Sequence, residues 1–167
     1  KDCNSVADEA AKISGVTKVL VCDNEIYSKH LAEPYADLIV SLSGDYNTFI
    51  APATTTSKNY MPRVAALLDV PQVSDIISVI DSQTFEHPIY AGNAIETVKL
   101  LSEKKVITVR ATAFQASEDQ EPVDIVAIDS ASNPGLSEYI SEELTESDRP
   151  ELTSAKIIIS GGRGMQS

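Results

Sequence analysis

The residues best suited to hold a charged ligand lie in the stretch SGGRG, residues 160–164. Gly161, Gly162 and Gly164 would let the backbone pass close to a ligand and point N–H groups at it. The guanidinium of Arg163 could pair with a phosphate or lie over an aromatic ring. The spacing matches neither G-x-G-x-x-G nor a P-loop, and the stretch lacks the helix that would add a dipole. From spacing alone, a tight turn with a surface arginine is an equally good interpretation.

A second set of polar residues is TTTSK, residues 54–58, followed by Arg63. Lys58 and Arg63 stand near the end of an expected strand and the start of an expected helix, where α/β folds place ligands. Three interpretations stay open: an ancestral phosphate site, a subunit or interdomain contact, or a surface ion pair. The hydroxyls of 54–58 are better explained by helix capping than by a cofactor cradle.

The remaining reactive side chains form no catalytic set in the sequence. His30 and His87 have no motif partner nearby, and no Ser/His/Asp set is recognisable. Asp75 and Glu96 fall on expected strands, where charged tips at a sheet rim explain them better than an acid–base pair.

Composition narrows the class of protein further. The 167 residues are 43% hydrophobic, which predicts one folded domain with a real core. The net charge of -12 argues against nucleic-acid binding, and no apolar run approaches the ~20 residues that cross a bilayer. Cys3 and Cys22 match no zinc pattern or disulfide framework, so a reducing compartment fits best.

The elements that position these residues begin as alternating helices and short apolar strands. Ser5 and Asp8 resemble a capping box that opens a helix with Val6, Ala10 and Ile13 on one face, and Gly15 fits its C-cap. TKVLVCD (17–23) and NTFIAPAT (47–54) predict strands buried on both faces of a parallel sheet. The helix between them has Pro34 in its first turn and an apolar stripe of Tyr35, Leu38, Ile39 and Leu42.

The pattern changes after the helix over 57–70, in which Val64, Leu67 and Leu68 are expected to pack inward. SDIISVI (74–80), HPIYAGNAIETVK (87–99) and KKVITVRAT (104–112) predict an antiparallel meander, because no helix-sized gap separates them. An acidic loop (114–122) and one more strand (123–129) follow. The predicted fold class is α/β: a parallel-sheet, nucleotide-binding-like (Rossmann-like) domain with an antiparallel β-meander extension.

Two long segments carry a resemblance to a known family. SDRPELTSAKIIISGGRGM (147–165) and SKNYMPRVAALLDVPQVSDI (57–76) resemble the α-subunit of electron transfer flavoprotein, as do IYAGNAIETVK and VITVRATAF. The similarity runs from Val19 to Gly164 in the family's order. Ser57 departs from the glycine that the family often has there. The family's Gln-His flavin-binding element would lie beyond Ser167, and its first strand and helix are not recognisable here.

The resemblance implies a division into domains and a cofactor. Residues 1–147 would be the N-terminal α/β domain without its first strand and helix, and 148–167 the linker and opening strand of the FAD-binding domain. Gly162, Arg163 and Gly164 would contact FAD, with Arg163 against the flavin ring. A fixed positive charge there would stabilise an anionic reduced flavin and raise its potential.

The same resemblance implies a function and partners. The family's FAD takes electrons from acyl-CoA dehydrogenases and related flavoenzymes and passes them to a membrane quinone oxidoreductase, so the protein would be a carrier rather than a bond-making enzyme. A β-subunit that holds AMP would complete the heterodimer, in the bacterial cytoplasm or the mitochondrial matrix, without direct membrane insertion. The alternatives are a stand-alone adenine-nucleotide-binding module of the same fold and an interaction scaffold that never touches flavin.

A sheet without its first strand has a physical consequence. Doubly wound sheets place that strand centrally, so two free edges or a gap are expected, with a tendency to aggregate. We therefore expect the chain alone to be poorly soluble, or to bind FAD weakly at best.

Overall fold

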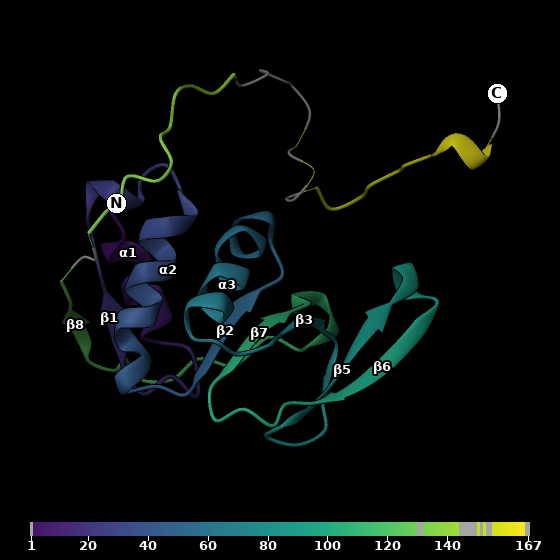
Figure 1. The fold of residues 1–167 in the computed structure, drawn as a ribbon, viewed down its shortest axis with the longest axis horizontal. Helices are drawn as coiled ribbons and strands as arrows, with labels where there is room; N and C mark the ends of the chain where they lie inside the picture. Colours follow the sequence, from purple (N-terminus) through teal and green to yellow (C-terminus); the bar gives the residue numbers. More distant parts are fainter. Residues whose placement is uncertain (1, 130–131, 144–149, 151, 153–154, 166–167) are drawn as a thin grey trace.

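The chain folds into helices packed on parallel and antiparallel β-sheets (Figure 1). The computed structural model describes residues 2–129, 132–143, 150, 152 and 155–165. Its helices are α1 (Asn4–Ala10), α2 (Ala32–Ser41) and α3 (Thr55–Leu67). Its strands are β1 (Val19–Val21), β2 (Thr48–Pro52), β3 (Gln72–Ile76), β4 (Ser78–Val79), β5 (Thr84–Ile89), β6 (Ala94–Lys99), β7 (Lys105–Val109) and β8 (Ile125–Ala127). The predicted fold class, Rossmann-like α/β with an antiparallel extension, is confirmed.

The core lies between the parallel sheet β2–β7–β3 and the helices α2 and α3. Buried side chains of β2 and β7 meet buried side chains of both helices there: Ala36, Phe49, Ala51, Met61, Val64, Ala65 and Val106. Each fully buried Val or Met stabilises the fold by roughly 1.5–3 kcal/mol relative to an exposed one. This cluster therefore fixes α3 against the sheet and sets the position of its N-terminus.

Helix α3 begins where the hydroxyl-rich stretch predicted it. The Thr54 side chain caps it by accepting a hydrogen bond from the Ser57 N–H at 3.2 Å. The inward face is built on Ser57, Met61, Val64 and Ala65, at i, i+4, i+7 and i+8. Leu67, which was predicted to pack inward, is 49% exposed because it lies off this stripe.

Helix α1 differs from its prediction in its ends and its buried face. It starts after Cys3 without a side-chain cap, so the Ser5–Asp8 capping box does not form. Small residues, Ala7 and Ala11, are buried, whereas Val6 is 63% exposed. A helix that packs closely on β1 needs small side chains at the contact. This explains why the face with Ala7 and Ala11 is buried instead of the predicted face with Val6. Gly15 has the expected left-handed φ of +91°, but it lies beyond the helix end at Ala10.

The predicted antiparallel meander is confirmed as the sheet β4–β5–β6, but the assignment of the predicted segments to its strands is wrong in part. The middle segment is a hairpin of β5 and β6, because Tyr90, Ala91 and Gly92 all have positive φ and reverse the chain. The first segment is divided between β3 and β4, and β7 lies in the centre of the parallel sheet. Strand β7 is buried on both faces at 106–108, so its VITV sequence marks a central parallel strand rather than a meander edge.

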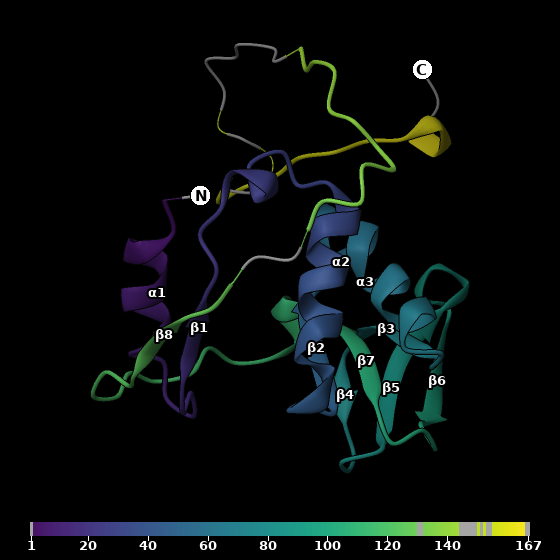
Figure 2. The same ribbon diagram turned by 60° about the vertical axis from the view of Figure 1, so that its left-hand side comes forward.

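Strands β1 and β8 form a separate parallel pair (Figure 2). Among the described residues β1 pairs with β8, and β2 pairs with β7, so no strand joins β1 to β2. The expectation that both strands are buried on both faces is wrong: Ile50 of β2 is 64% exposed, and β1 is half-buried throughout. A strand that has a hydrogen-bonded neighbour on one side only is less covered than a central strand, which explains the exposure of Ile50.

After β8 the chain returns across α2. Ser137 Oγ donates to Glu33 at 2.7 Å, and Lys29 Nζ reaches Glu142 at 3.3 Å and the Tyr139 ring at 4.2 Å. The predicted linker, Thr145 to Leu152, lies outside the described residues except for positions 150 and 152. Over the part of the chain that the structure describes, no helix is long and apolar enough to cross a membrane.

Candidate functional site

The predicted flavin-contacting residues form a tight turn apart from the folded body. Arg163–Met165 is one turn of 3-10 helix, closed by a hydrogen bond from the Met165 N–H to the Gly162 carbonyl at 3.0 Å. Figure 1 shows this turn, in yellow, away from the sheets and helices. The Gly162, Arg163 and Gly164 backbone and side chains are exposed. The structure thus places these three residues together on one turn, and among the described residues no other segment covers them.

The space beside the glycines fits the approach of a flat ligand. A Cβ atom at Gly162 or Gly164 would meet nothing within 4 Å, whereas one at Gly161 would clash with the Met165 sulfur. The Met165 side chain is flexible and could move away from such a Cβ atom, and the other two glycines leave their backbone open. With the guanidinium of Arg163 on the same turn, the backbone of two glycines and one cation are open to solvent, and their contact with a flavin stays a prediction.

The strand predicted before this turn does not form. Residues 156–160 pair with no strand among the described residues, and Ile157, Ile158 and Ile159 are 83%, 55% and 96% exposed. An isolated apolar strand gains neither ladder hydrogen bonds nor burial, so the sequence preference alone cannot fix it.

A cleft of about 430 Å³ lies at the carboxyl ends of β2, β3 and β7, the edge where open α/β sheets bind ligands. Its polar lining comes from the start of α3, from the end of β3 and from the segment after β7: Thr54, Lys58, Asp75, Arg110 and Thr112. Topology therefore gathers side chains that are far apart in the sequence.

The charged pair in this cleft is Asp75 with Arg110. The Arg110 Nε donates to Asp75 Oδ1 at 3.2 Å, and its second nitrogen contacts Oδ2. The Arg110 hydrogen bonds lower the pKa of the Asp75 carboxyl below its usual value. The Asp75 N–H donates to the buried Thr108 hydroxyl at 2.9 Å, which holds the backbone at a φ of +58° within a register shift of β3. Asp75 is therefore an ionised structural carboxylate rather than a proton donor.

The two cations flagged in the sequence have different surroundings. Lys58 is exposed at the cleft, and among the described residues no carboxylate lies within 4.0 Å of its Nζ. Arg63 is half-buried, and its Nε has no hydrogen-bond partner in the described part of the chain. A surface ion pair thus does not explain Lys58 within the described part, while the phosphate and contact interpretations stay predictions.

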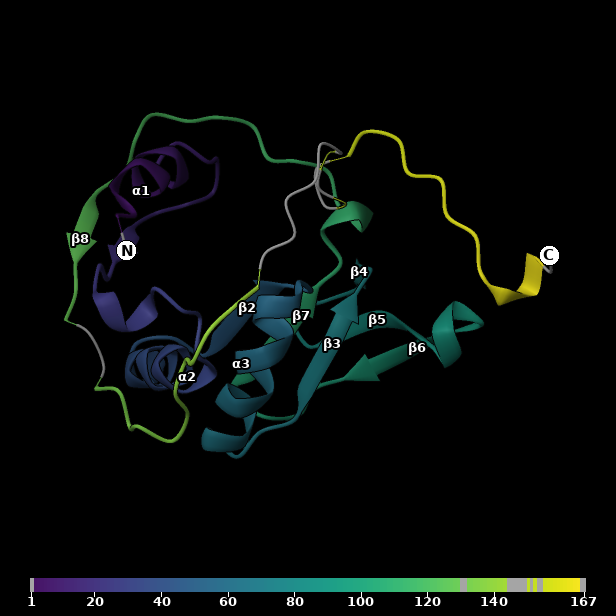
Figure 3. The same cartoon turned by 90° about the horizontal axis from the view of Figure 1, so that it is seen from above.

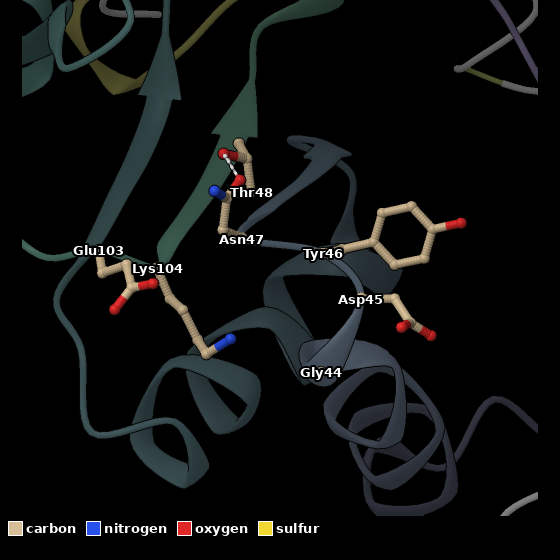
Figure 4. Close-up of a pocket in the computed structure, with 7 residues that line it drawn as sticks. All are labelled: Gly44, Asp45, Tyr46, Asn47, Thr48, Glu103 and Lys104. Atoms are coloured by element: carbon tan, nitrogen blue, oxygen red, sulfur yellow. Dashed lines mark hydrogen bonds between the residues drawn. The ribbon is translucent and has the colours of Figure 1, made fainter.

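A second hollow lies at the opposite, amino-terminal ends of β2 and β7 (Figure 4). Its lysine, Lys104, donates to the Ser43 carbonyl at the end of the turn that follows α2. Figure 4 shows Asp45 and Tyr46 directed away from Lys104. This lysine therefore ties a helix end to the sheet, and the polar groups do not converge on a common point.

Both histidines have partners that sequence spacing did not reveal. His87 Nε2 lies 2.9 Å from Glu96 Oε2, because the two residues are direct neighbours across β5 and β6. His30 Nδ1 lies 3.0 Å from the Tyr35 hydroxyl. Recognising the hairpin turn would have predicted the first pair. Cys3 and Cys22 are free, and the described residues contain no group of three potential metal ligands.

The fold and its sites define a class of protein: a Rossmann-like α/β domain with a cleft at the carboxyl ends of its parallel strands and a separate glycine–arginine turn. The family profile described as "Electron transfer flavoprotein domain" matches residues 1–133. The chain belongs to the electron transfer flavoprotein family.

Comparison with individual relatives supports the same family and points to one of its subunits. The chain is 53% identical to the electron transfer flavoprotein subunit alpha of Paracoccus denitrificans over 163 residues, which are 98% of this chain and 53% of that protein. It is 52% identical to the subunit of the same name from Pseudomonas aeruginosa, over 97% of the chain and 53% of the relative. The mitochondrial subunit alpha of Dictyostelium discoideum is 44% identical over 98% of the chain and 51% of the relative. The chain thus spans about half the length of these relatives.

Proposed function

We propose that this chain serves as the scaffolding part of an electron transfer flavoprotein α-subunit and contributes one side of its FAD site. The observation that carries the proposal is the 53% identity to a subunit alpha across 98% of the chain. In this proposal residues 1–147 form the α/β domain that contacts the β-subunit, and 148–167 lead into the FAD-binding domain. AMP would be held by the β-subunit.

The carrier would accept electrons from acyl-CoA dehydrogenases and related flavoenzymes and deliver them to a quinone oxidoreductase. Bound FAD would supply the one- and two-electron chemistry. The relatives' names include a mitochondrial subunit and subunits from bacteria, which supports a mitochondrial matrix or bacterial cytoplasmic location.

Within this function the chain's own contribution is electrostatic. The turn at Gly162–Gly164 would bring backbone N–H groups and the Arg163 guanidinium to the ring system. If the guanidinium of Arg163 lay about 4 Å from the added electron, their attraction would stabilise the reduced flavin by about 1 kcal/mol at the dielectric constant of water. At the lower effective dielectric constant near a protein surface the stabilisation would be about 4 kcal/mol. Because 1.4 kcal/mol corresponds to about 59 mV for one electron, the effect reaches tens of millivolts or more.

The experiment is redox potentiometry of the α/β heterodimer with Arg163→Ala. We expect the first one-electron potential of bound FAD to fall by roughly 40 mV or more. Arg163→Lys should retain more of the potential, and Arg110→Ala should leave it unchanged, since Arg110 is paired with Asp75 in the cleft. An unchanged potential in Arg163→Ala, with FAD still bound, would defeat the proposal.

A second candidate, an adenine-nucleotide site on this chain, is favoured by the cleft itself. Lys58 and the Thr54-capped start of α3 line it at the carboxyl ends of the parallel strands. Calorimetry with AMP and ATP tests this candidate. Heat of binding that disappears in Lys58→Ala would support it, and no heat at millimolar nucleotide would leave the carrier function as the account of this chain.

A further inference from the structure

The chain has two cysteines, Cys3 and Cys22, and the fold places both beside one cavity. The cavity measures about 380 Å³, is mostly apolar and has walls from α1, β1 and α2. Both thiols are free, and both residues are half-buried. The fold thus gathers two thiol-bearing residues that α1 separates in the sequence.

The elements that carry the two cysteines meet at one end. Cys3 is the residue before α1, and Cys22 directly follows the last residue of β1. Figure 2 shows the start of α1, next to the label N, at the same end of the molecule as the carboxyl end of β1. Figure 3 shows α1 and β8, the strand that pairs with β1, on the side of the molecule away from the β5–β6 hairpin and from the glycine–arginine turn. The cysteine pair is therefore separate from that turn.

A carboxylate clamp holds the backbone of Cys3 against the end of β1. The Asp23 Oδ1 atom accepts a hydrogen bond from the Asp2 N–H at 3.1 Å, and its Oδ2 atom accepts one from the Cys3 N–H at 3.3 Å. Because Asp23 is the residue next to Cys22, these bonds bring the backbone of one cysteine to the neighbour of the other. Two bonds to one carboxylate also fix the direction in which the chain enters α1.

Close packing of α1 on β1 acts in the same direction. The buried face of α1 consists of small side chains, Ala7 and the following Ala11. The separation of packed elements depends on the side chains at their contact, so alanines let this helix approach the strand closely. A disulfide needs Cα atoms about 4.4–6.8 Å apart, and a helix start held close to a strand end favours such a separation.

We propose that Cys3 and Cys22 are a redox modification site, at which the two thiols form a reversible disulfide that ties the start of α1 to the end of β1. A structural zinc site takes four ligands, whereas the described residues contain no group of three potential metal ligands. Disulfide formation is the chemistry that two thiols carry out without a third residue. In a reducing compartment such disulfides are transient and serve redox sensing or catalysis.

The oxidant is a low-molecular-weight disulfide, for which oxidised glutathione is the probe. The thiolate of one cysteine attacks a sulfur of oxidised glutathione, forms a mixed disulfide and releases one reduced glutathione. The thiolate of the other cysteine attacks the protein sulfur of that mixed disulfide and releases the second. Two protein thiols are thereby oxidised by two electrons, one glutathione disulfide is reduced, and the two thiol protons leave on the two glutathione molecules.

Equilibration with a glutathione buffer tests the proposal on the 167-residue chain. The chain is held in mixtures of reduced and oxidised glutathione, once folded and once in concentrated urea, and is then alkylated. Trypsin cleaves after Lys12 and Lys18, so the disulfide joins peptides 2–12 and 19–29 and is counted by mass spectrometry. Because the fold holds the two thiols at a higher effective concentration than a flexible loop does, we expect an equilibrium constant at least tenfold larger in the folded chain.

The same factor must appear in the folding equilibrium, because the two equilibria form one thermodynamic cycle. A tenfold factor equals about 1.4 kcal/mol, so the Tm of the disulfide form should lie about 3–6 °C above that of the reduced chain. Asp23→Ala removes the clamp and should lower the equilibrium constant of the folded chain at least threefold. Asp8→Ala, on the exposed face of α1, is the matched control and should leave it unchanged.

The α/β heterodimer provides a second measurement, because the same two tryptic peptides report on the pair there. We expect the linked peptides at the same ratio of reduced to oxidised glutathione, and this measurement decides if the chain alone precipitates. Folding that raises the equilibrium constant less than tenfold, oxidation that stops at mixed disulfides with glutathione, equal values in Asp23→Ala and Asp8→Ala, or no linked peptides from the heterodimer would overturn the proposal.

Discussion

Substitution of Thr108 tests how the cleft at the carboxyl ends of β2, β3 and β7 is held in shape. This side chain is fully buried in the central strand β7, and its Oγ1 accepts the Asp75 N–H at 2.9 Å. The bond anchors a residue whose φ of +58° is unfavourable for a non-glycine side chain. Thr108→Val keeps the shape of the side chain but removes the acceptor, so the Asp75 N–H loses its partner.

The expected cost follows from the geometry. A buried donor left without a partner costs about 1–3 kcal/mol, and replacing the hydroxyl by a methyl group returns up to about 0.8 kcal/mol. From the middle of the first range, about 2 kcal/mol, the net loss is about 1–2 kcal/mol in the free energy of unfolding. For a chain of this size each kcal/mol lowers the Tm by about 2–4 °C, which gives a fall of roughly 2–8 °C.

The assay is reversible urea and thermal unfolding followed by circular dichroism. Thr108→Ser, which retains the hydroxyl, should restore part of the loss, and Thr97→Val on exposed β6 should change the stability by less than about 0.5 kcal/mol. If Thr108→Val and Thr97→Val unfold at the same urea concentration, the Thr108 hydroxyl does not stabilise the Asp75 backbone, and the reasoning is wrong.

Two other substitutions test the same region by urea unfolding. Thr54→Ala should lower the free energy of unfolding by about 1 kcal/mol, because the α3 cap is lost. Thr55→Ala is the control, since the Thr55 side chain does not cap the helix, and it should not lower that free energy by this amount. Equal losses in the two variants would contradict the capping role of Thr54. Asp75→Asn tests the ion pair with Arg110: the folded pKa of Asp75 lies below its unfolded value, so its stabilisation is present above about pH 4 and is lost as the pH falls through the folded pKa. We expect Asp75→Asn to cost up to about 1 kcal/mol at pH 7 and progressively less as the pH falls through the folded pKa of Asp75, and a pH-independent difference would contradict this.

The fold could be predicted from sequence wherever local pattern and tertiary role agree. The hydroxyl cap at Thr54 and the apolar stretches of β1 and β2 have short-range signals, and their elements are present. The third segment of the meander was misassigned because the signal that distinguishes it is not local: β7 has the sequence of an apolar strand, and only its pairing between β2 and β3 makes it part of the parallel sheet. Three consecutive positive-φ residues at 90–92 reverse the chain without the Asn-Gly or Asp-Gly pair that marks a common hairpin.

The candidate site was predictable in composition but not in arrangement. Lys58 was flagged from its place between strand and helix, yet the pairing of Asp75 with Arg110 needs β3 and β7 to be neighbours, 35 residues apart in sequence. Family resemblance singled out Gly162–Gly164. Their contact with FAD stays a prediction.

An FAD titration shows whether Gly162–Gly164 supply only one side of a flavin site. Binding is followed by visible absorption, once with the 167-residue chain and once with a full-length α/β heterodimer. We expect no stoichiometric binding to the chain alone and one FAD per heterodimer, with the potential of the bound FAD set in part by Arg163. Tight, one-to-one FAD binding by the 167-residue chain alone would contradict it.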